Sequence, residues 1–433
     1  MKKEPDKYRG GDTGPGMGMG GDMGGFSLGR QTFSSFKNPV YRLYYGAMLG
    51  QWSSMNMQTI ARSYLIYDLT GSIAILGVMA LAMTIPLLIL SLFGGVIAER
   101  VQKKYVLLAG QASSAVISLG IALSITLGYL STEISGSWWI LIAASVFQGI
   151  IMGLMMPSRQ AIIREIVSEE QLMNAVALNN MGMNTLRIVA PAITGRIIDA
   201  FGYAAVYYAM TGMYLMAVAF IAFMPLTSTM SVSGGGTLVD IKEGLKYIRH
   251  EPTILLVLAF TLFAVILSMP YMMLMPVFAV DILKVGPKGG GDLMSVSGIG
   301  AIIGSLTLAS LPNKKRGLLL LAGSLLLGLA LVGFSFSTSW PLSLGLIAFV
   351  GLGSTARMTL SNTLIQYYVD DDYRGRVMSI YMMEFGLMGF GVFAASMLAE
   401  AMGAQWAVGG FAMVLVLVSL LAFAFVPRIR KLD

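Results

Sequence analysis

Long uncharged stretches alternate along the chain with short polar segments that hold most of its Lys, Arg, Asp and Glu residues. Each uncharged stretch is about as long as the roughly 20 residues that a helix needs to cross a bilayer. The pattern predicts six membrane-spanning helices before residue 226 and six after residue 252. Their approximate ranges are 43–67, 75–98, 105–128, 137–158, 172–198, 203–225, 253–280, 292–311, 317–336, 341–368, 377–399 and 404–427.

The composition fits an integral membrane protein, because 56 % of the 433 residues are hydrophobic and only 12 % are charged. So few charges could not cover the surface of a soluble protein of this length. The net charge of +7 is spread over short segments instead of gathering on one face, as nucleic-acid binding would require. We therefore expect the chain to sit in a lipid bilayer and to have no nucleic-acid partner.

The distribution of positive residues predicts the orientation of the chain. Of its 29 Lys and Arg residues, 23 lie near the two termini or in every second connecting segment, and four lie within predicted helices. Only Lys284 and Lys288 lie in the remaining connections. Because Lys and Arg are retained on the cytoplasmic side, both termini should be cytoplasmic. We expect a multi-pass protein of the bacterial inner (plasma) membrane.

The two halves of the chain repeat weakly, since Gly149 and Val167 recur 202 residues later as Gly351 and Val369. Parallel repeats of six helices are typical of two-lobed transporters, in which the substrate path runs between the lobes. The predicted fold class is an all-α integral membrane protein with two pseudo-symmetric six-helix bundles. The expected divisions are a disordered glycine-rich cytoplasmic tail at 1–35, a bundle at 36–225, a cytoplasmic linker with an amphipathic helix at 226–252, and a bundle at 253–433.

A charged turn between the second and third predicted helices resembles the signature loop of the major facilitator superfamily, G-x-L-a-D-R-x-G-R-K. The residues that fit this pattern or replace one of its members are Gly95, Glu99, Arg100, Lys103 and Lys104. Glu99 stands where Asp is usual, and a helix N-terminus favours either carboxylate. The resemblance implies a conformational latch that holds the two lobes together when the transporter faces outward. The alternative is a basic anchor that only sets topology.

A second match lies in the fifth predicted helix, where Pro191 and Gly195 resemble an antiporter motif of the same superfamily, with Ala190 in place of a glycine. Pro and small residues permit a kink and close helix contact. Together with Asn38-Pro39 and the run 157–161, these features resemble the enterobactin-exporter-like and macrolide-efflux-like permeases. The resemblance implies alternating access driven by an ion gradient, usually export coupled to protons.

Charged residues inside predicted helices are the strongest functional candidates, because each costs several kcal/mol unless it faces a cavity or a partner. Glu384 is the one acid well inside a helix, and Arg357 lies at a similar depth in the preceding helix. We expect Glu384 to take up and release a proton, controlled by Arg357 or, when the lobes approach, by Arg187. The alternative is a permanent structural ion pair.

Polar residues at helical spacing in the first and fifth predicted helices indicate a surface that faces water or substrate. The alternative is helix packing through amide hydrogen bonds. In the seventh predicted helix, Met residues between two prolines indicate either a deformable wall for apolar substrates or a kinked, well-packed helix. The predicted cavity residues are Gln51, Met55, Gln58, Arg62, Asn180, Asn184, Tyr271 and Met272.

Several function classes are excluded or disfavoured by what the sequence lacks. It contains no Cys, one His and no Gly-rich loop followed by Lys and Ser or Thr, which argues against thiol chemistry, metal sites and ATP as an energy source. We expect no cofactor, no metal and no enzymatic activity. The predicted function is proton-coupled export of small amphipathic molecules, of drug or siderophore type, by a monomer. Alternatives are an uptake permease, a lipid-like substrate flippase, or a receptor or scaffold that transports nothing.

Overall fold

The computed structural model describes residues 33–226, 237–312 and 314–432, and nearly all of them are helical. The side chains of 92–100, 237–241 and 385 are not described. The first half contains η1 (Ser34–Lys37), α2 (Pro39–Thr70), α3 (Ile73–Arg100), α4 (Lys103–Thr126), α5 (Trp139–Ile166) and α6 (Glu169–Ala222). The second half contains α7 (Thr237–His250), α8 (Pro252–Ser268), α9 (Pro270–Met273), α10 (Met275–Val277), η2 (Phe278–Ile282), α11 (Gly286–Ser310), α12 (Arg316–Phe336), α13 (Trp340–Tyr368), α14 (Asp371–Met402), α15 (Ala404–Phe425) and α16 (Pro427–Arg430).

Twelve membrane crossings follow from these helices, as the sequence predicts. Within the described residues, ten helices are long and apolar enough to span a bilayer. One of them, α6, has 54 residues and contains two crossings, because Gly202 adopts φ 77° and ψ 178° and turns the chain back. Only glycine takes such angles without strain. The crossing that completes the twelve is α2, the first along the chain, which has 32 residues but is more polar than the others.

Local signals explain where the first crossing begins and ends. The side chain of Asn38 accepts hydrogen bonds from the backbone N–H groups of Val40 and Tyr41, at 2.9 and 3.3 Å, and Pro39 occupies the first helical position. Asn38 also donates to the carbonyl of Ile166 at 2.7 Å, which ties the start of α2 to the end of α5. Gly71, at φ 60°, ends α2 in the left-handed conformation.

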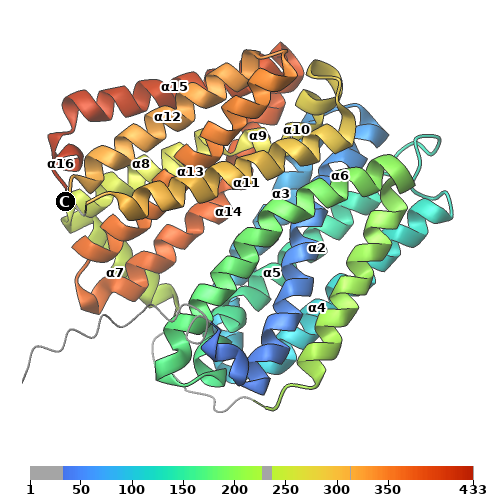
Figure 1. The fold of residues 1–433 in the computed structure, drawn as a ribbon, viewed down its shortest axis with the longest axis horizontal. Coiled ribbons are helices and arrows are strands. Elements are labelled where there is room, and N and C mark those ends of the chain that lie inside the picture. The colour runs from blue at the N-terminus through green and yellow to red at the C-terminus, as the bar shows by residue number, and fades with distance from the viewer. Residues whose placement is uncertain (1–32, 227–236, 313, 433) are drawn as a thin grey trace, which may run out of the picture.

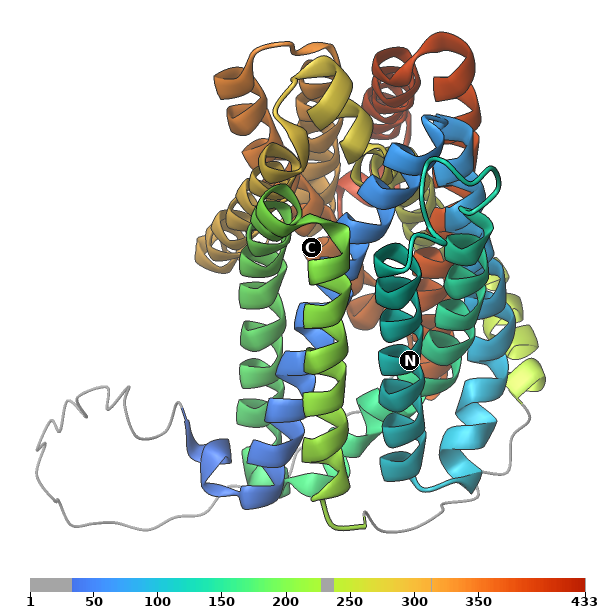
Figure 2. The same ribbon diagram turned by 90° about the vertical axis from the view of Figure 1, so that its right-hand side faces the viewer.

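The helices form two bundles with matching internal contacts. In the first bundle α3 packs on α5 and α4 packs on both α5 and α6, while in the second α11 packs on α13 and α12 packs on both α13 and α15. The bundles meet mainly through two helix pairs, α6 with α11 and α3 with α14. Figure 1 shows their helices inclined to each other, so that the bundles converge where α10 and α11 approach α2 and α6. Figure 2 shows α2 running obliquely beside both halves of α6.

The linker helix α7 docks on the second bundle. The rings of Tyr247 and Tyr373 stack with centroids 4.3 Å apart, and Arg376 forms a 3.1 Å ion pair with Glu243. The backbone N–H of Asp370 donates to the hydroxyl of Tyr247 at 3.1 Å. These contacts fix α7 against the beginning of α14.

The seventh crossing is broken as its two prolines predict. The chain leaves the regular helix at Met269, directly before Pro270, and again at Leu274, two residues before Pro276. It then forms the π-helical turn η2. Since Pro lacks a backbone N–H, each one removes a helical hydrogen bond. The break brings the segment around Tyr271 to the interface between the bundles, where it contacts α2, α3 and α14.

Candidate functional site

One end of the molecule is sealed by polar contacts between the bundles. This sealed end carries the α2–α3 connection and the ends of α14 and α11. The carboxylate of Glu400, from α14, accepts hydrogen bonds from the backbone N–H groups of Ile73 and Ala74 at 2.7 and 2.9 Å, and from the hydroxyl of Ser72 at 3.4 Å. Glu400 therefore caps a helix of the opposite bundle, where the partial positive charge of the helix dipole favours a carboxylate.

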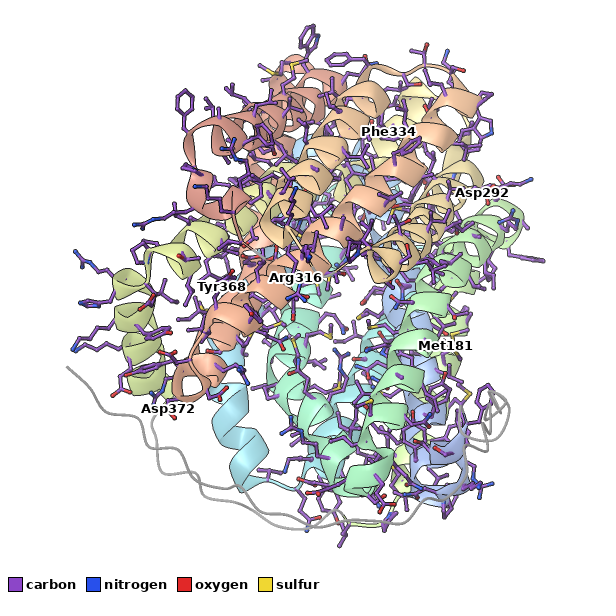
Figure 3. All side chains as sticks on the ribbon, turned by 60° about the vertical axis from the view of Figure 1, so that its left-hand side comes forward. Met181, Asp292, Arg316, Phe334, Tyr368 and Asp372 are labelled. Atoms are coloured by element: carbon purple, nitrogen blue, oxygen red, sulfur yellow. The ribbon has the colours of Figure 1, made fainter. Side chains whose placement is uncertain are left out.

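Three more polar contacts complete this seal. Arg196 of α6 forms a 2.8 Å ion pair with Asp292 of α11, whose position between the bundles is labelled in Figure 3. The hydroxyl of Tyr67 donates to Asp281. One turn further in, the hydroxyl of Ser295 donates to the carbonyl of Ile188 at 2.5 Å. Between described residues, the hydrogen bonds and ion pairs that link the two bundles all belong to this end.

Small residues allow the backbones of α6 and α11 to touch below the rim of the seal. A Cβ atom on Gly291 would lie 2.4 Å from the carbonyl oxygen of Pro191, and one on Gly195 would lie 2.5 Å from that of Pro287. Both distances are far below any normal contact, so only glycine fits. The structure thus places Pro191 and Gly195, expected to form a kink, in the contact between the two bundles.

A small pocket lies between the bundles, about two helical turns in from the Tyr67–Asp281 contact, or roughly 12 Å at 1.5 Å per residue. Its volume is about 40 Å³. Helices α2 and α6 contribute from the first bundle, and α9 and α11 from the second. Its lining residues are Asn56, Thr59, Ile60, Arg187, Pro191, Tyr271, Met272, Met294 and Ser297.

The pocket brings Arg187 together with polar groups from both bundles. The hydroxyls of Tyr271 and Ser297 are 3.4 Å apart. The Asn56 amide and the Thr59 hydroxyl bond to carbonyls of their own helix, at 2.8 and 3.1 Å. Among the described residues, none forms a hydrogen bond or ion pair with Arg187. The site therefore offers one positive charge without a protein counter-charge.

The predicted cavity residues divide between this pocket, its surroundings and the bundle interior. Tyr271 and Met272 line the pocket. Asn180 and Asn184 are exposed on α6, on the turns that lead from Arg187 away from the sealed end. They continue the stripe that Arg187 begins.

The remaining predicted cavity residues lie on another face of α2. Gln51 is 2 % exposed and directs its amide N–H to the sulfur of Met155 in α5, and Arg62 bonds to Ser145 in α5 and to the sulfur of Met83 in α3. They therefore point into their own bundle. Gln58 is buried and Met55 is partly buried. The pocket-facing stripe of α2 is Asn56, Thr59 and Ile60 instead, which the spacing of Gln51 and Arg62 did not reveal.

Glu384 lies inside the second bundle, 5 % exposed, and accepts a hydrogen bond from the hydroxyl of Thr261 in α8. Arg357 is 1 % exposed and is close enough to interact electrostatically with Glu384, but the two do not form an ion pair within 4 Å. The structure brings them into one buried cluster, to which Tyr381 also belongs. Thr261 was not anticipated, because nothing in the sequence marks one threonine of an apolar helix.

The expected latch loop is only partly visible. Helix α3 runs through Gly95, Glu99 and Arg100, but their side chains lie outside the described residues. Lys103 forms a 2.5 Å ion pair with Glu165, and Lys104 donates to backbone carbonyls at the end of α6, at 2.5 and 2.9 Å. In this conformation both lysines are held by their own bundle.

A larger hollow of about 950 Å³ lies on the outer side of α4 and α5. Its lining is mostly apolar and runs from Tyr105 at one end to Phe147 towards the other. Since it faces away from the other bundle, acyl chains of a bilayer would cover it. Its polar side chains are the hydroxyls of Tyr105 and Ser113, and its described lining contains no charged group.

The comparisons with known proteins agree with this architecture. Residues 30–433 match the model of a family described as transmembrane secretion effector. The chain belongs to this family. The match covers nearly the whole chain and includes both bundles.

Several characterised proteins are similar to this member of the transmembrane secretion effector family. The staphyloferrin A transporter of Staphylococcus aureus is 25 % identical over 370 residues, which cover 85 % of this chain and 89 % of that protein. The enterobactin exporter EntS of Shigella boydii is 26 % identical over 299 residues, covering 66 % and 68 %. Macrolide efflux protein A of Streptococcus pyogenes is 21 % identical over 411 residues, covering 93 % and 99 %.

Solved structures show the same fold at low identity. The nucleoside transporter NupG matches with a TM-score of 0.73 and 12 % identity over 90 % of this chain and 99 % of that one. A D-xylose–proton symporter matches with a TM-score of 0.70 and 14 % identity, over 92 % and 99 %. The predicted fold class and the resemblance to the major facilitator superfamily are confirmed. This transmembrane secretion effector is a multi-pass membrane transporter of the efflux or secretion type, not an enzyme.

Proposed function

We propose that the protein exports small amphipathic molecules, of drug or siderophore type, by alternating access coupled to protons. The observation that carries this proposal is the pocket between two bundles whose described hydrogen bonds and ion pairs to each other lie at one end of the molecule. Helices α3 and α14 also pack closely, as far as Leu88 and Gly386. Because the seal consists of a few polar contacts and glycine-mediated helix contacts, the bundles can rock about the pocket without unfolding either core. The three relatives named above carry siderophores or macrolides, which fits a substrate of this class.

The orientation we propose places the sealed end outside the cell. The opposite end carries Lys103 and Lys104 and both ends of the described chain, and most of the described positive residues lie on that side. Lys and Arg favour the cytoplasmic side. Both termini would then be cytoplasmic, and the structure would represent an inward-facing conformation. A single chain supplies both walls of the pocket, so a monomer suffices for transport.

Glu384 is our candidate for the proton carrier. It is a buried carboxyl group that interacts with Arg357 at a distance longer than an ion pair, so a change in that distance would alter its proton affinity. Arg187 lies at the pocket and reaches this cluster only through a rearrangement of the bundles. A permanent structural role for Glu384 and Arg357 is the competing explanation.

The deciding experiment uses the full chain in proteoliposomes with an imposed pH gradient. Outward antiport of a panel of amphipathic compounds supports the proposal, inward symport supports an uptake permease, and movement of lipid-like substrates supports a flippase. No flux of any compound would indicate a receptor or scaffold.

The same vesicles test the proton carrier. Glu384→Gln should abolish pH-driven flux while leaving substrate exchange without a gradient intact, since exchange needs no net proton movement. Asp372→Asn, which removes an exposed acid at the start of α14 (Figure 3), should change neither. If Glu384→Gln retains pH-driven flux, Glu384 does not carry the proton.

A further inference from the structure

The charge of the cargo can be inferred from the pocket between the bundles. Arg187 is the only ionisable side chain of its lining other than the phenol of Tyr271. A guanidinium at this depth in a membrane protein is normally paired or faces a cavity, because its desolvation is costly. Here it faces the pocket, and no described carboxylate accompanies it.

The buried carboxylate of Glu384 does not neutralise Arg187. Its carboxylate accepts a hydrogen bond from Thr261 and interacts with Arg357, within the second bundle. Arg62, a further buried base of the first bundle, bonds only to neutral groups. The described membrane-embedded groups around the pocket therefore have an excess of positive charge.

The remaining polar groups of the pocket suit a carboxylate. A guanidinium binds a carboxylate through two parallel hydrogen bonds. The Tyr271–Ser297 pair shares one hydroxyl proton internally and has a second one free to donate, and Asn56 has a second amide N–H beyond the one given to Trp52. A volume of about 40 Å³ is larger than the roughly 10–15 Å³ that a cavity needs to hold one water molecule, so it admits a small head group.

The rest of such a molecule has a defined direction in which to extend. Asn180 and Asn184 lie on exposed turns of α6 between Arg187 and the unsealed end. Met272 and Met294 provide adaptable apolar surface beside the charged group. A molecule with a carboxylate at one end and a larger, partly polar body would match this order of groups.

We propose that the protein binds an anionic amphipathic cargo by its carboxylate, with Arg187 as the ion-pair partner and with the amide of Asn56 from the first bundle and a hydroxyl of the Tyr271–Ser297 pair from the second completing the site. This proposal rests on the proposed transport function but makes a narrower claim. A cationic drug would find no acid in the pocket and would be repelled by Arg187.

Equilibrium binding to the purified full chain in nanodiscs tests this claim without requiring transport. The probes are 4-phenylbutyrate, its amide 4-phenylbutyramide, and (3-phenylpropyl)trimethylammonium, which share one apolar body and differ in the head group. A charge-assisted hydrogen-bond pair predicts that the carboxylate binds about 10- to 100-fold more tightly than the amide, and the cation most weakly.

Variants assign this preference to one residue. Arg187→Gln should make carboxylate and amide bind equally, while Arg187→Lys should keep part of the preference because it keeps the charge. Arg428→Gln, which removes an exposed positive charge from α16, is the matched control and should bind like the unchanged protein. Since Arg187→Lys differs little in size and charge, it tests the site even if Arg187→Gln folds poorly.

The outcomes separate this proposal from the general one. The proposal is overturned if the carboxylate fails to bind, if the amide binds as tightly, or if the preference survives in Arg187→Gln. If the carboxylate binds as expected but vesicles show no flux of any compound, the transport function fails and the anion site stands. If vesicles export only cations, transport stands and the anion site is wrong.

Discussion

The contact of Glu400 with the start of α3 gives the sharpest prediction about the conformational cycle. Replacing Glu400 with Ala removes the acceptor for two backbone N–H groups, at 2.7 and 2.9 Å, and for the hydroxyl of Ser72. Loss of a helix cap costs about 1 kcal/mol, and loss of a carboxylate at a helix N-terminus about 0.3–1 kcal/mol more. Because Glu400 is exposed, water replaces part of the lost hydrogen bonding, and we expect the replacement to destabilise the contact between the bundles by about 1–2 kcal/mol in total.

That energy is present only while the bundles meet, so its loss should act on the equilibrium between the sealed and unsealed states. A change of 1–2 kcal/mol corresponds to a shift of about 5- to 30-fold towards the unsealed state. Glu400→Gln keeps one acceptor oxygen but no charge, and it should produce a smaller shift than Glu400→Ala. The order of the two variants is therefore part of the prediction.

Distance measurements between spin labels can follow this equilibrium. The sequence contains no Cys, so labels can be placed at Glu133→Cys and Ser339→Cys without removing native thiols. These exposed positions lie in the α4–α5 and α12–α13 connections, one on each bundle. Asp372→Asn serves as the control for loss of an exposed acid. Unchanged distance distributions in both Glu400 variants would falsify the assignment of Glu400 as a clamp across the bundles.

Two further predictions concern helix contacts. Gly291→Val should abolish transport in vesicles while leaving the protein folded, because the valine side chain would meet the carbonyl of Pro191 and keep α6 and α11 apart. Gly345→Val is the control and should transport normally, since a Cβ at Gly345 meets nothing within 4 Å. Tyr373→Ala should lose a stacking contact with Tyr247 worth about 0.5–1.5 kcal/mol. The segment before Tyr247 should then become more sensitive to limited proteolysis. An unaltered cleavage rate would contradict the docking of α7.

The crossings and the break in the seventh helix were predictable because they depend on local sequence. A run of uncharged residues must cross the bilayer as a helix wherever it lies in the fold, and a proline breaks a helix whatever surrounds it. The same holds for the cap at Asn38. The importance of Arg187 was also visible, since an arginine within an apolar run has few tolerable environments.

The contacts between distant segments were not predictable. Glu400 caps a helix that begins 327 residues earlier, and no local pattern links the two positions. The face of α2 that lines the pocket was not predictable for a different reason, because α2 carries polar residues on two faces. Gln51 and Arg62 turn towards α5, whereas Asn56 and Thr59 face the pocket, and only the packing of the whole bundle distinguishes these faces.

The backbone contact between Gly291 and Pro191 has a consequence for the speed of the transport cycle. When two surfaces meet through side chains, each encounter must select rotamers again, and that ordering opposes association. A surface of glycine and main-chain oxygen has no such freedom to lose. At this contact the two halves can therefore separate and rejoin in each transport cycle with little entropic resistance, and their rejoining should be limited by the removal of water from the peptide groups.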